Sequence, residues 1–186
     1  AIQRNWIGKS TGVEVEFDIV GGGKFSIFTT CIETIYGITF MVLAPDGAIT
    51  ESLLDRVENI DEVKAYIEET RKKNDMDRTE LNKTKSGCEL KGVTCINPVN
   101  GKEVPLYIGD FVLASYGTGA VMAVPSHDQR DFEYAIVHNI PMIQVIDGGD
   151  VSEKAVATYE YLGKGRTLKN KEKKTGSAQE HAQTTH

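Results

Sequence analysis

Several features that would indicate other classes of protein are missing from this chain of 186 residues. No apolar run approaches the roughly 20 residues of a membrane-spanning helix, and residues 1–6 carry no signal-peptide pattern. The three cysteines, Cys31, Cys88 and Cys95, are odd in number and lack C-x-x-C spacing. This pattern favours reduced thiols over disulfides and argues against a zinc site. We therefore expect a cytosolic protein without a metal.

The chain also lacks an excess of positive charge. Its 21 Lys and Arg residues stand against 27 Asp and Glu residues, which gives a net charge of −6. No global attraction therefore draws the domain to a polyanion, and any contact with nucleic acid must be local or aided by other parts of a larger protein. Its length and its apolar content of 40% fit one domain with a true core.

Apolar periodicity predicts an α+β domain built on a mixed sheet or barrel, because the strands are unevenly spaced and helices are inserted between them. We expect residues 1–165 to form this domain. Residues 166–186 form a polar tail with almost no large apolar side chains, typical of a poorly ordered end or of an addition from cloning. The expected strands are 13–19, 25–30, 38–43, 93–96, 104–115 (one or two), 120–124 and 142–146, and the expected helical regions are 50–85 and 128–138.

The most informative segment is residues 116–135, where a Gly117-Thr118-Gly119 loop runs into a short apolar strand that ends at Pro125. A helix begins at once, with two carboxylates near its start. Such a layout suits a ligand with an apolar side chain and a cationic amine. The two glycines either permit a tight turn or let a ligand approach the backbone. No third glycine and no Walker lysine follow, so a nucleotide-phosphate loop is not indicated.

Capping explains part of the polar sequence at this helix start. Ser126 followed by Gln129 predicts a capping box, and Asp128 in the first turn complements the helix dipole. Asp131 lies one turn further on, where capping does not need it, so solvated surface and ligand binding are equally open for it. His127 is either a general base or a residue that hydrogen-bonds locally, and no second histidine lies at metal-ligand spacing.

A second candidate site is a strand end crowded with threonines: Thr29, Thr30 and Thr34. Ordinary β-propensity accounts for them. Alternatively, their hydroxyl and methyl groups line a small pocket that excludes a bulkier branched substrate. Exclusion by shape discriminates between substrates by only about 1–3 kcal/mol per methylene. When this is too little, a second site that hydrolyses the wrong product becomes useful.

Four segments of the chain, in order, resemble the editing domain of bacterial-type leucyl-tRNA synthetase, the insertion called connective polypeptide 1. They are residues 5–10, the Thr-Thr-x-x-x-Thr-x-Tyr-Gly element at 29–37, residues 97–101 and residues 116–135. The last is the most specific, since isoleucyl and valyl relatives usually carry His in place of Met122. The resemblance spans about Asn5 to Gly163 and implies a β-barrel-like core of mixed strands with peripheral helices.

The resemblance also implies a reaction, the hydrolysis of the ester that joins a wrong amino acid to the terminal adenosine of tRNA(Leu). Norvaline, isoleucine and methionine are the implied substrates. Asp131 matches the residue that binds the α-ammonium group, and Thr34 matches the one that keeps leucine out. Thr29 and Thr30 match the pair near the ribose and the attacking water. The other implied substrate-binding residues are Met122 and Val124 in the pocket wall, and Tyr116, His127, Asp128, Gly117 and Gly119 beside it.

The implied partners are the tRNA(Leu) 3′ end and, in cis, the rest of the synthetase, with the fragment itself a monomer. Editing needs no cofactor in this scheme, because an activated ester requires only positioning and charge complementarity. The full-length synthetase would use ATP and Mg²⁺.

One departure from the family pattern bears on activity. Most bacterial members read Thr-Thr-Arg-Pro-Asp-Thr, whereas this chain has Cys31, Ile32 and Glu33 between the threonines. Losing the cation removes a contact to phosphate or ribose, and losing the proline loosens the loop. Three functions therefore stand at this point: an editing hydrolase, a non-catalytic module that binds the tRNA 3′ end, and a freestanding structural or interaction domain.

Overall fold

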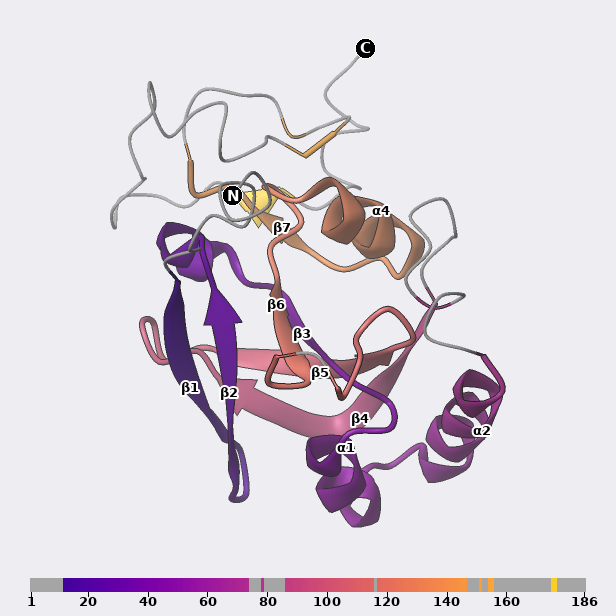
Figure 1. Ribbon diagram of the computed structural model, residues 1–186. Helices are drawn as coiled ribbons and strands as arrows, with labels where there is room; N and C mark the ends of the chain where they lie inside the picture. Colours follow the sequence, from indigo (N-terminus) through magenta and orange to yellow (C-terminus); the bar gives the residue numbers. More distant parts are fainter. Residues whose placement is uncertain are drawn as a thin grey trace, which may run out of the picture.

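The structure is a computed structural model that describes residues 12–73, 78, 86–115, 117–146, 151, 154–155 and 175–176. Its centre is a six-stranded sheet of order β2-β1-β4-β5-β3-β6 (Figure 1). The strands are β1 (Val13–Ile19), β2 (Lys24–Thr29), β3 (Phe40–Leu43), β4 (Gly87–Ile96), β5 (Glu103–Gly109) and β6 (Ala120–Ala123). A second sheet pairs β7 (Met142–Ile143) with β8 (Thr175–Gly176). The helices are α1 (Ala48–Leu53), α2 (Ile60–Arg71) and α4 (Gln129–Val137), with 3₁₀ turns η2 (Ile32–Gly37) and η3 (Leu54–Arg56).

The sheet is mixed, as the sequence predicts. β3 and β5 pair in parallel, whereas the other neighbouring strands of this sheet pair antiparallel. The outer strands β2 and β6 approach each other with Cα atoms within 8 Å, yet no ladder joins them in the described part of the chain. The predicted α+β class with peripheral helices is therefore confirmed, and the sheet curls without closing into a barrel.

The first hairpin shows why these residues form strands. In β1, buried Phe17 and Ile19 alternate with exposed charged residues, and β2 returns Phe25 and Ile27 to the same core. The connection passes through residues 21–23, three glycines whose φ angles lie between 85° and 110°. Only glycine adopts these values without strain, so the glycine run sets the tight return.

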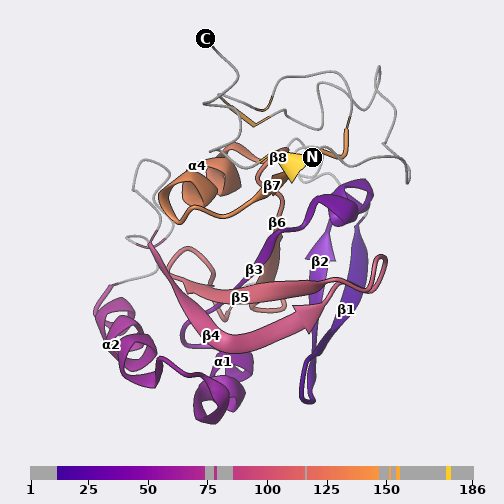
Figure 2. The ribbon, with the colours of Figure 1, turned by 180° about the vertical axis from the view of Figure 1, so that it is seen from behind.

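Both faces of the sheet are covered, and β3 contributes to both cores. Met41 and Leu43 point into a core shared with α1, α2 and the β1–β2 hairpin. Phe40 and Val42 point into a second core shared with α4. Figures 1 and 2 accordingly place α4 at one end of the molecule and α1 and α2 at the other, with the sheet between them. The prediction of a strand buried on both faces is confirmed, since all four residues of β3 are buried.

Several element boundaries differ from the predicted ones. β4 begins six residues earlier than expected, and its pairing with β5 is irregular between Glu89 and Thr94, around Gly92. The predicted strand over 104–115 ends at Gly109, and the last predicted strand shrinks to β7. The predicted turn at 97–101 is confirmed, because Gly101 has a φ of 68° and donates its N–H to the carbonyl of Asn97.

Some sequence predictions fall outside the described residues. These are the motif at 5–10, Tyr116, the end of the predicted helical region at 79–85, and all of the polar tail except 175–176. Among the residues that are described, no helix combines the length and the apolar character needed to cross a membrane.

Candidate active site

The two sequence motifs, separated by about ninety residues along the chain, meet in one pocket of about 200 Å³. We call it the Asp131 pocket. It lies between the connection from β2 to η2, the end of β6 and the start of α4. It is lined by Phe28, Thr29, Cys31, Thr34, Val121, Met122, Val124, His127, Asp128 and Asp131. The predicted carboxylates, the apolar wall and two of the three threonines thus belong to a single site.

The carboxylate of Asp131 is held in place by the backbone. Its Oδ2 accepts a hydrogen bond of 2.9 Å from the N–H of Val124, just past the end of β6. The side chain is half-buried and lines the pocket. Asp131 therefore joins the end of β6 to α4. The interpretation of Asp131 as a solvated residue on the helix surface does not hold. A carboxylate at this place provides negative charge for a cationic group in the pocket.

The predicted capping box at this helix start is wrong. Asp128, rather than Ser126, is the N-cap of α4, and its carboxylate accepts from the backbone N–H groups of Arg130 and Asp131. Ser126 lies two residues before the N-cap, in the turn that follows β6, and its hydroxyl has no hydrogen-bond partner. Because the chain turns once more after Pro125, the helix begins two residues later than a cap at Ser126 would place it, and one residue later than the predicted range of 128–138.

The threonine loop is organised around Cys31. The hydroxyl of Thr34 donates to the carbonyl of Cys31 at 2.8 Å, and the N–H of Cys31 donates to Oγ1 of Thr29 at 3.1 Å. Thr34 is almost completely buried, at 2% exposure, which β-propensity alone would not demand. Thr30 is exposed, its hydroxyl lies 3.8 Å from the Cys31 sulfur, and it does not line the pocket.

His127 has a structural role that the sequence could not show. Its Nε2 accepts hydrogen bonds from the backbone N–H groups of Val145 and Ile146, at 3.0 and 3.2 Å. Accepting at Nε2 requires the tautomer with the proton on Nδ1. The lone pair that a general base would use is therefore occupied, and the buried imidazole ties the segment just after β7 to the turn just before α4. The partners lie 18 and 19 residues away, so neither of the two interpretations left open by the sequence, a general base or a local hydrogen bond, describes these contacts.

The glycine loop lies beyond the residues that line the pocket. Gly117 and Gly119 have φ angles of 66° and 71°, so their conformation alone explains the residue type. A Cβ at Gly117 would meet no atom within 4 Å. The Gly119 carbonyl accepts from the N–H of Ala44, which fixes the turn beside the end of β3. Of the two interpretations left open by the sequence, the turn is the one that these contacts support.

Two apolar residues at the pocket were not predicted. Phe28 and Val121 are 52% and 39% exposed, and both line the pocket. Phe28 is the last residue before the threonine pair, on the outward side of β2. Alternation along β2 places it outside, but only the approach of β6 makes that side part of a pocket. That approach is a long-range contact without a local sequence pattern.

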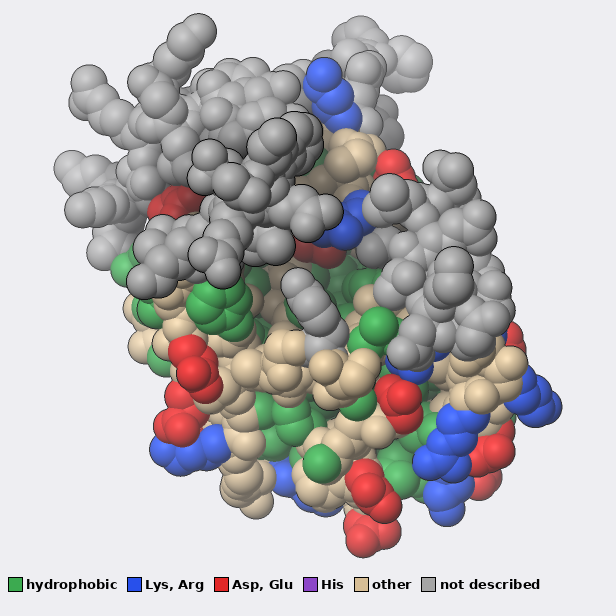
Figure 3. Space-filling model, viewed as in Figure 1, with side chains coloured by type: hydrophobic (Ala, Val, Ile, Leu, Met, Phe, Trp, Pro, Cys, Tyr) green, Lys and Arg blue, Asp and Glu red, His purple; other side chains and the backbone are tan. Residues whose placement is uncertain are grey.

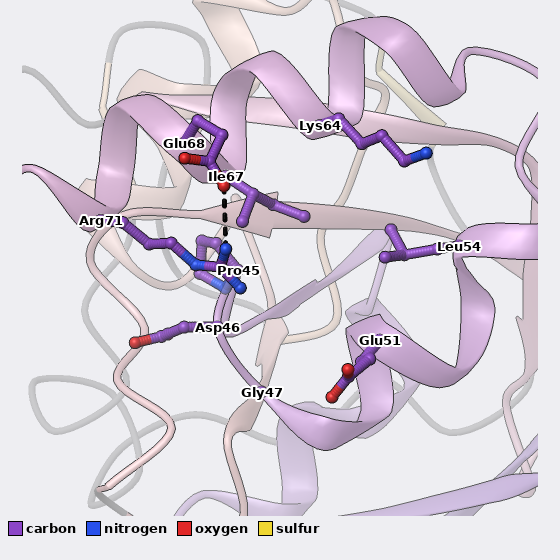
Figure 4. A pocket seen from close by; sticks show the side chains of 9 residues that line it. All are labelled: Pro45, Asp46, Gly47, Glu51, Leu54, Lys64, Ile67, Glu68 and Arg71. Atoms are coloured by element: carbon purple, nitrogen blue, oxygen red, sulfur yellow. Dashed lines mark hydrogen bonds and ion pairs between the residues drawn. The ribbon is translucent and has the colours of Figure 1, made fainter.

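A further hollow of about 300 Å³ lies between the loop after β3 and helices α1 and α2 (Figure 4). Glu68 and Arg71 of α2 form an ion pair of 2.8 Å above Pro45, while Glu51 of α1 lies on the other side. None of the predicted site residues lines this hollow. Its lining residues include three carboxylates and two cations, so they carry only a small net negative charge.

Comparison with known proteins agrees with this geometry. The family model described as "Leucyl-tRNA synthetase, editing domain" matches residues 4–185, nearly the whole sequence, and the chain belongs to this family. A leucine–tRNA ligase of Alkaliphilus oremlandii is 46% identical over 158 residues, which are 85% of this chain and 20% of that relative. The chain thus spans about a fifth of the length of this curated relative.

A solved structure is similar as well. It is a ternary complex of LeuRS, tRNA and LeuAMS from Agrobacterium radiobacter, with a TM-score of 0.65 and 35% sequence identity. The match covers 81% of this chain and 18% of that one. The predicted family and the fold class are thereby confirmed, and a proofreading role within a synthetase is supported.

Proposed function

We propose that this domain hydrolyses the ester bond of tRNA(Leu) that carries a wrong amino acid, with norvaline, isoleucine and methionine as substrates. The observation that carries this proposal is the meeting of Asp131 and Thr34 with the apolar residues Met122 and Val124 in one pocket. A carboxylate, an apolar wall and a buried threonine are what a site needs in order to recognise an α-amino group and select one aliphatic side chain.

Each group has a distinct part in selection. Asp131 pairs with the α-ammonium group that every aminoacyl ester carries, so it confers affinity without selectivity. Thr34 confers selectivity. Its hydroxyl is bonded to the carbonyl of Cys31, so its methyl group is the part that meets the substrate side chain. A branched γ-carbon, as in leucine, collides with this methyl group, whereas the unbranched norvaline side chain passes beside it.

The chemistry requires positioning more than a strong base. Water attacks the carbonyl carbon, the bond from this carbon to the ribose oxygen breaks, and the ribose hydroxyl is restored with a proton from the water. Thr29 uses its oxygen to accept from the N–H of Cys31, so its own proton is available to a ribose oxygen or to the water. His127 is held away from this role, and the vicinal ribose hydroxyl assists instead. Thr30 sits at the ribose side, outside the pocket.

Capture of the tRNA depends on the rest of the synthetase. In the view of Figure 3, acidic and basic side chains of the described residues are interspersed, without a continuous basic surface on this face. A net charge of −6 points the same way. Phosphate contacts dominate binding to nucleic acid, so the remainder of the enzyme supplies most of them in cis. Editing itself uses no cofactor in this scheme, while ATP and Mg²⁺ serve the aminoacylation site elsewhere in the enzyme.

The test is deacylation of isoleucyl- and norvalyl-tRNA(Leu), with leucyl-tRNA(Leu) as the control, at high concentration of the domain and again after transplanting it into a full-length synthetase. We expect selective release of the wrong amino acids. Thr34→Ala should extend hydrolysis to leucyl-tRNA(Leu), since it removes the excluding methyl group. If leucyl-tRNA remains intact with this variant, the assignment of Thr34 is wrong.

A second candidate function is a non-catalytic module that binds the tRNA 3′ end. It is favoured by one observation, the Cys31-Ile32-Glu33 sequence in the loop that fixes Thr29 and Thr34. Binding of an aminoacyl-adenosine analogue without release of any amino acid, in both the isolated and the transplanted domain, would establish this function in place of hydrolysis.

A further inference from the structure

A third pocket, of about 450 Å³, lies at the opposite end of α4 from the Asp131 pocket. It is formed by the residues just before β3, the facing strands β4 and β5, and the turn between α4 and β7. We call it the His138 pocket, after the residue that caps the C-terminal end of α4 and lines it. No residue of the Asp131 pocket belongs to it, and the proposed editing function makes no use of it.

Three side chains of the His138 pocket form one group. Glu89 and Tyr107 are directly paired on the antiparallel strands β4 and β5, so their side chains project from the same face of the sheet. The Tyr107 ring meets the His138 ring edge to face, with centroids 6.1 Å apart. His138 in turn stacks on Tyr134 at 4.1 Å. The pocket thus has a carboxylate beside a wall of packed aromatic rings.

The lining of the His138 pocket carries a net negative charge at neutral pH, because the Glu89 carboxylate lies beside neutral rings. Burial lowers the pKa of His138, against a smaller opposing effect of the Glu89 charge, so the imidazole is neutral. Burial and the negative charge of Glu89 raise the pKa of Tyr107 to about 12, so the phenol is neutral as well. The C-terminal end of α4 adds partial negative charge. Lys102 and Glu103 at the rim are both exposed and oppose each other in sign.

We propose that the His138 pocket binds a small organic cation, a guanidinium or ammonium group on a short aliphatic chain. The cation lies against the Tyr107 and His138 rings and pairs with Glu89. Aromatic faces beside a carboxylate are the arrangement that attracts organic cations. The described residues contain no group of three His, Cys, Asp or Glu side chains suited to a metal ion, whereas an organic cation requires only one carboxylate.

The experiment is a titration of the ¹⁵N-labelled chain with butylguanidinium, followed by amide shifts, with neutral butylurea as the isosteric control. We expect saturable shifts at residues 89, 107 and 138–140, and none of comparable size with butylurea. Glu89→Gln should weaken binding about tenfold or more, because it removes a charge-assisted bond without changing shape.

Two controls separate this site from others. Asp55→Asn removes one exposed carboxylate that does not line the pocket and should leave the affinity unchanged. Asp131→Asn tests whether the cation enters the editing pocket instead, and it should also leave the affinity unchanged. A parallel titration with N-acetylarginine amide distinguishes two sources of the cation. If this compound binds more tightly than butylguanidinium, the pocket takes an arginine side chain of a peptide. If it binds more weakly, the pocket takes a free small cation. Equal shifts with butylurea, or equal affinity of Glu89→Gln and wild type, would overturn the proposal, whether or not the domain hydrolyses aminoacyl-tRNA.

Discussion

Asp131 has two separable roles, and a pair of substitutions distinguishes them. Its carboxylate lines the pocket, and its Oδ2 accepts from the N–H of Val124. Asp131→Asn removes the charge but keeps a carbonyl oxygen for that bond. Asp131→Ala removes both. If the carboxylate binds the substrate's ammonium group, both variants should lose hydrolysis, while only the alanine variant should lose much stability.

The expected losses of activity and of stability follow from two interactions of Asp131, the proposed one with the substrate's ammonium group and the hydrogen bond from Val124. A hydrogen bond to a charged group is worth about 1.5–3 kcal/mol, which corresponds to a loss of about 10- to 150-fold in kcat/KM for isoleucyl-tRNA(Leu). Val124 is 5% exposed, so the alanine variant leaves a buried N–H without a partner. This costs about 1–3 kcal/mol in the free energy of unfolding. The asparagine variant should stay within about 0.5 kcal/mol of wild type, the range usual for a substitution that leaves the packing intact.

The assays are steady-state deacylation and urea unfolding of both variants. A wild-type rate with Asp131→Asn would refute the role of the charge, because the geometry of the pocket is kept. Equal loss of stability in both variants would refute the role of the Val124 bond, because asparagine retains the acceptor.

Three further predictions concern other parts of the chain. His127→Ala should lower the free energy of unfolding by about 2 kcal/mol or more, since two backbone N–H groups lose their acceptor; lost hydrolysis at unchanged stability in urea unfolding would restore the general-base interpretation. Gly87→Ala should destabilise the domain by about 1–3 kcal/mol, because the added Cβ would overlap the Tyr134 hydroxyl; an unchanged urea midpoint would contradict this. Cys31 should react first with a thiol reagent at pH 8 and be protected by an adenosine analogue, because it is partly exposed and burial raises the pKa of the other two thiols to about 11 and about 12, three and four units above the pH; mass-spectrometric labelling of all three at one rate would contradict it.

The sequence predicts those parts of the fold that depend on local patterns. Alternation identified β1 and β2, the apolar run identified β3, and Asn-Gly identified the turn at residues 97–101. The predicted ends of strands and helices were wrong where contacts between distant parts of the chain determine them. β4 extends past Gly92 because β5 supplies partners on both sides of the irregularity. α4 begins at Gln129 because an extra turn after Pro125 makes Asp128 the cap.

The candidate site was predictable as a set of residues but not as a set of contacts. Spacing alone left Asp131 open between solvated surface and ligand binding, and the family resemblance assigned it to the site; the structure places its carboxylate against Val124 in the pocket. The bonds from Val145 and Ile146 to His127 join segments that no local pattern relates. The roles assigned to the individual residues remain predictions, which the variants above test.

The parallel pairing of β3 with β5 has a consequence for the order of folding. The β1–β2 and β4–β5 hairpins close over short loops, whereas β3 reaches β5 only after residues 44–102 have been arranged between them. The entropy cost of closing this long loop must be met before the β3–β5 hydrogen bonds can stabilise the sheet. This requirement slows folding. Because β3 is the only described strand that pairs with β6, the strand that leads to the Asp131 pocket is fixed late. Hydrogen exchange during refolding should therefore protect the two hairpins before β6, so that the pocket forms last on a sheet already in place.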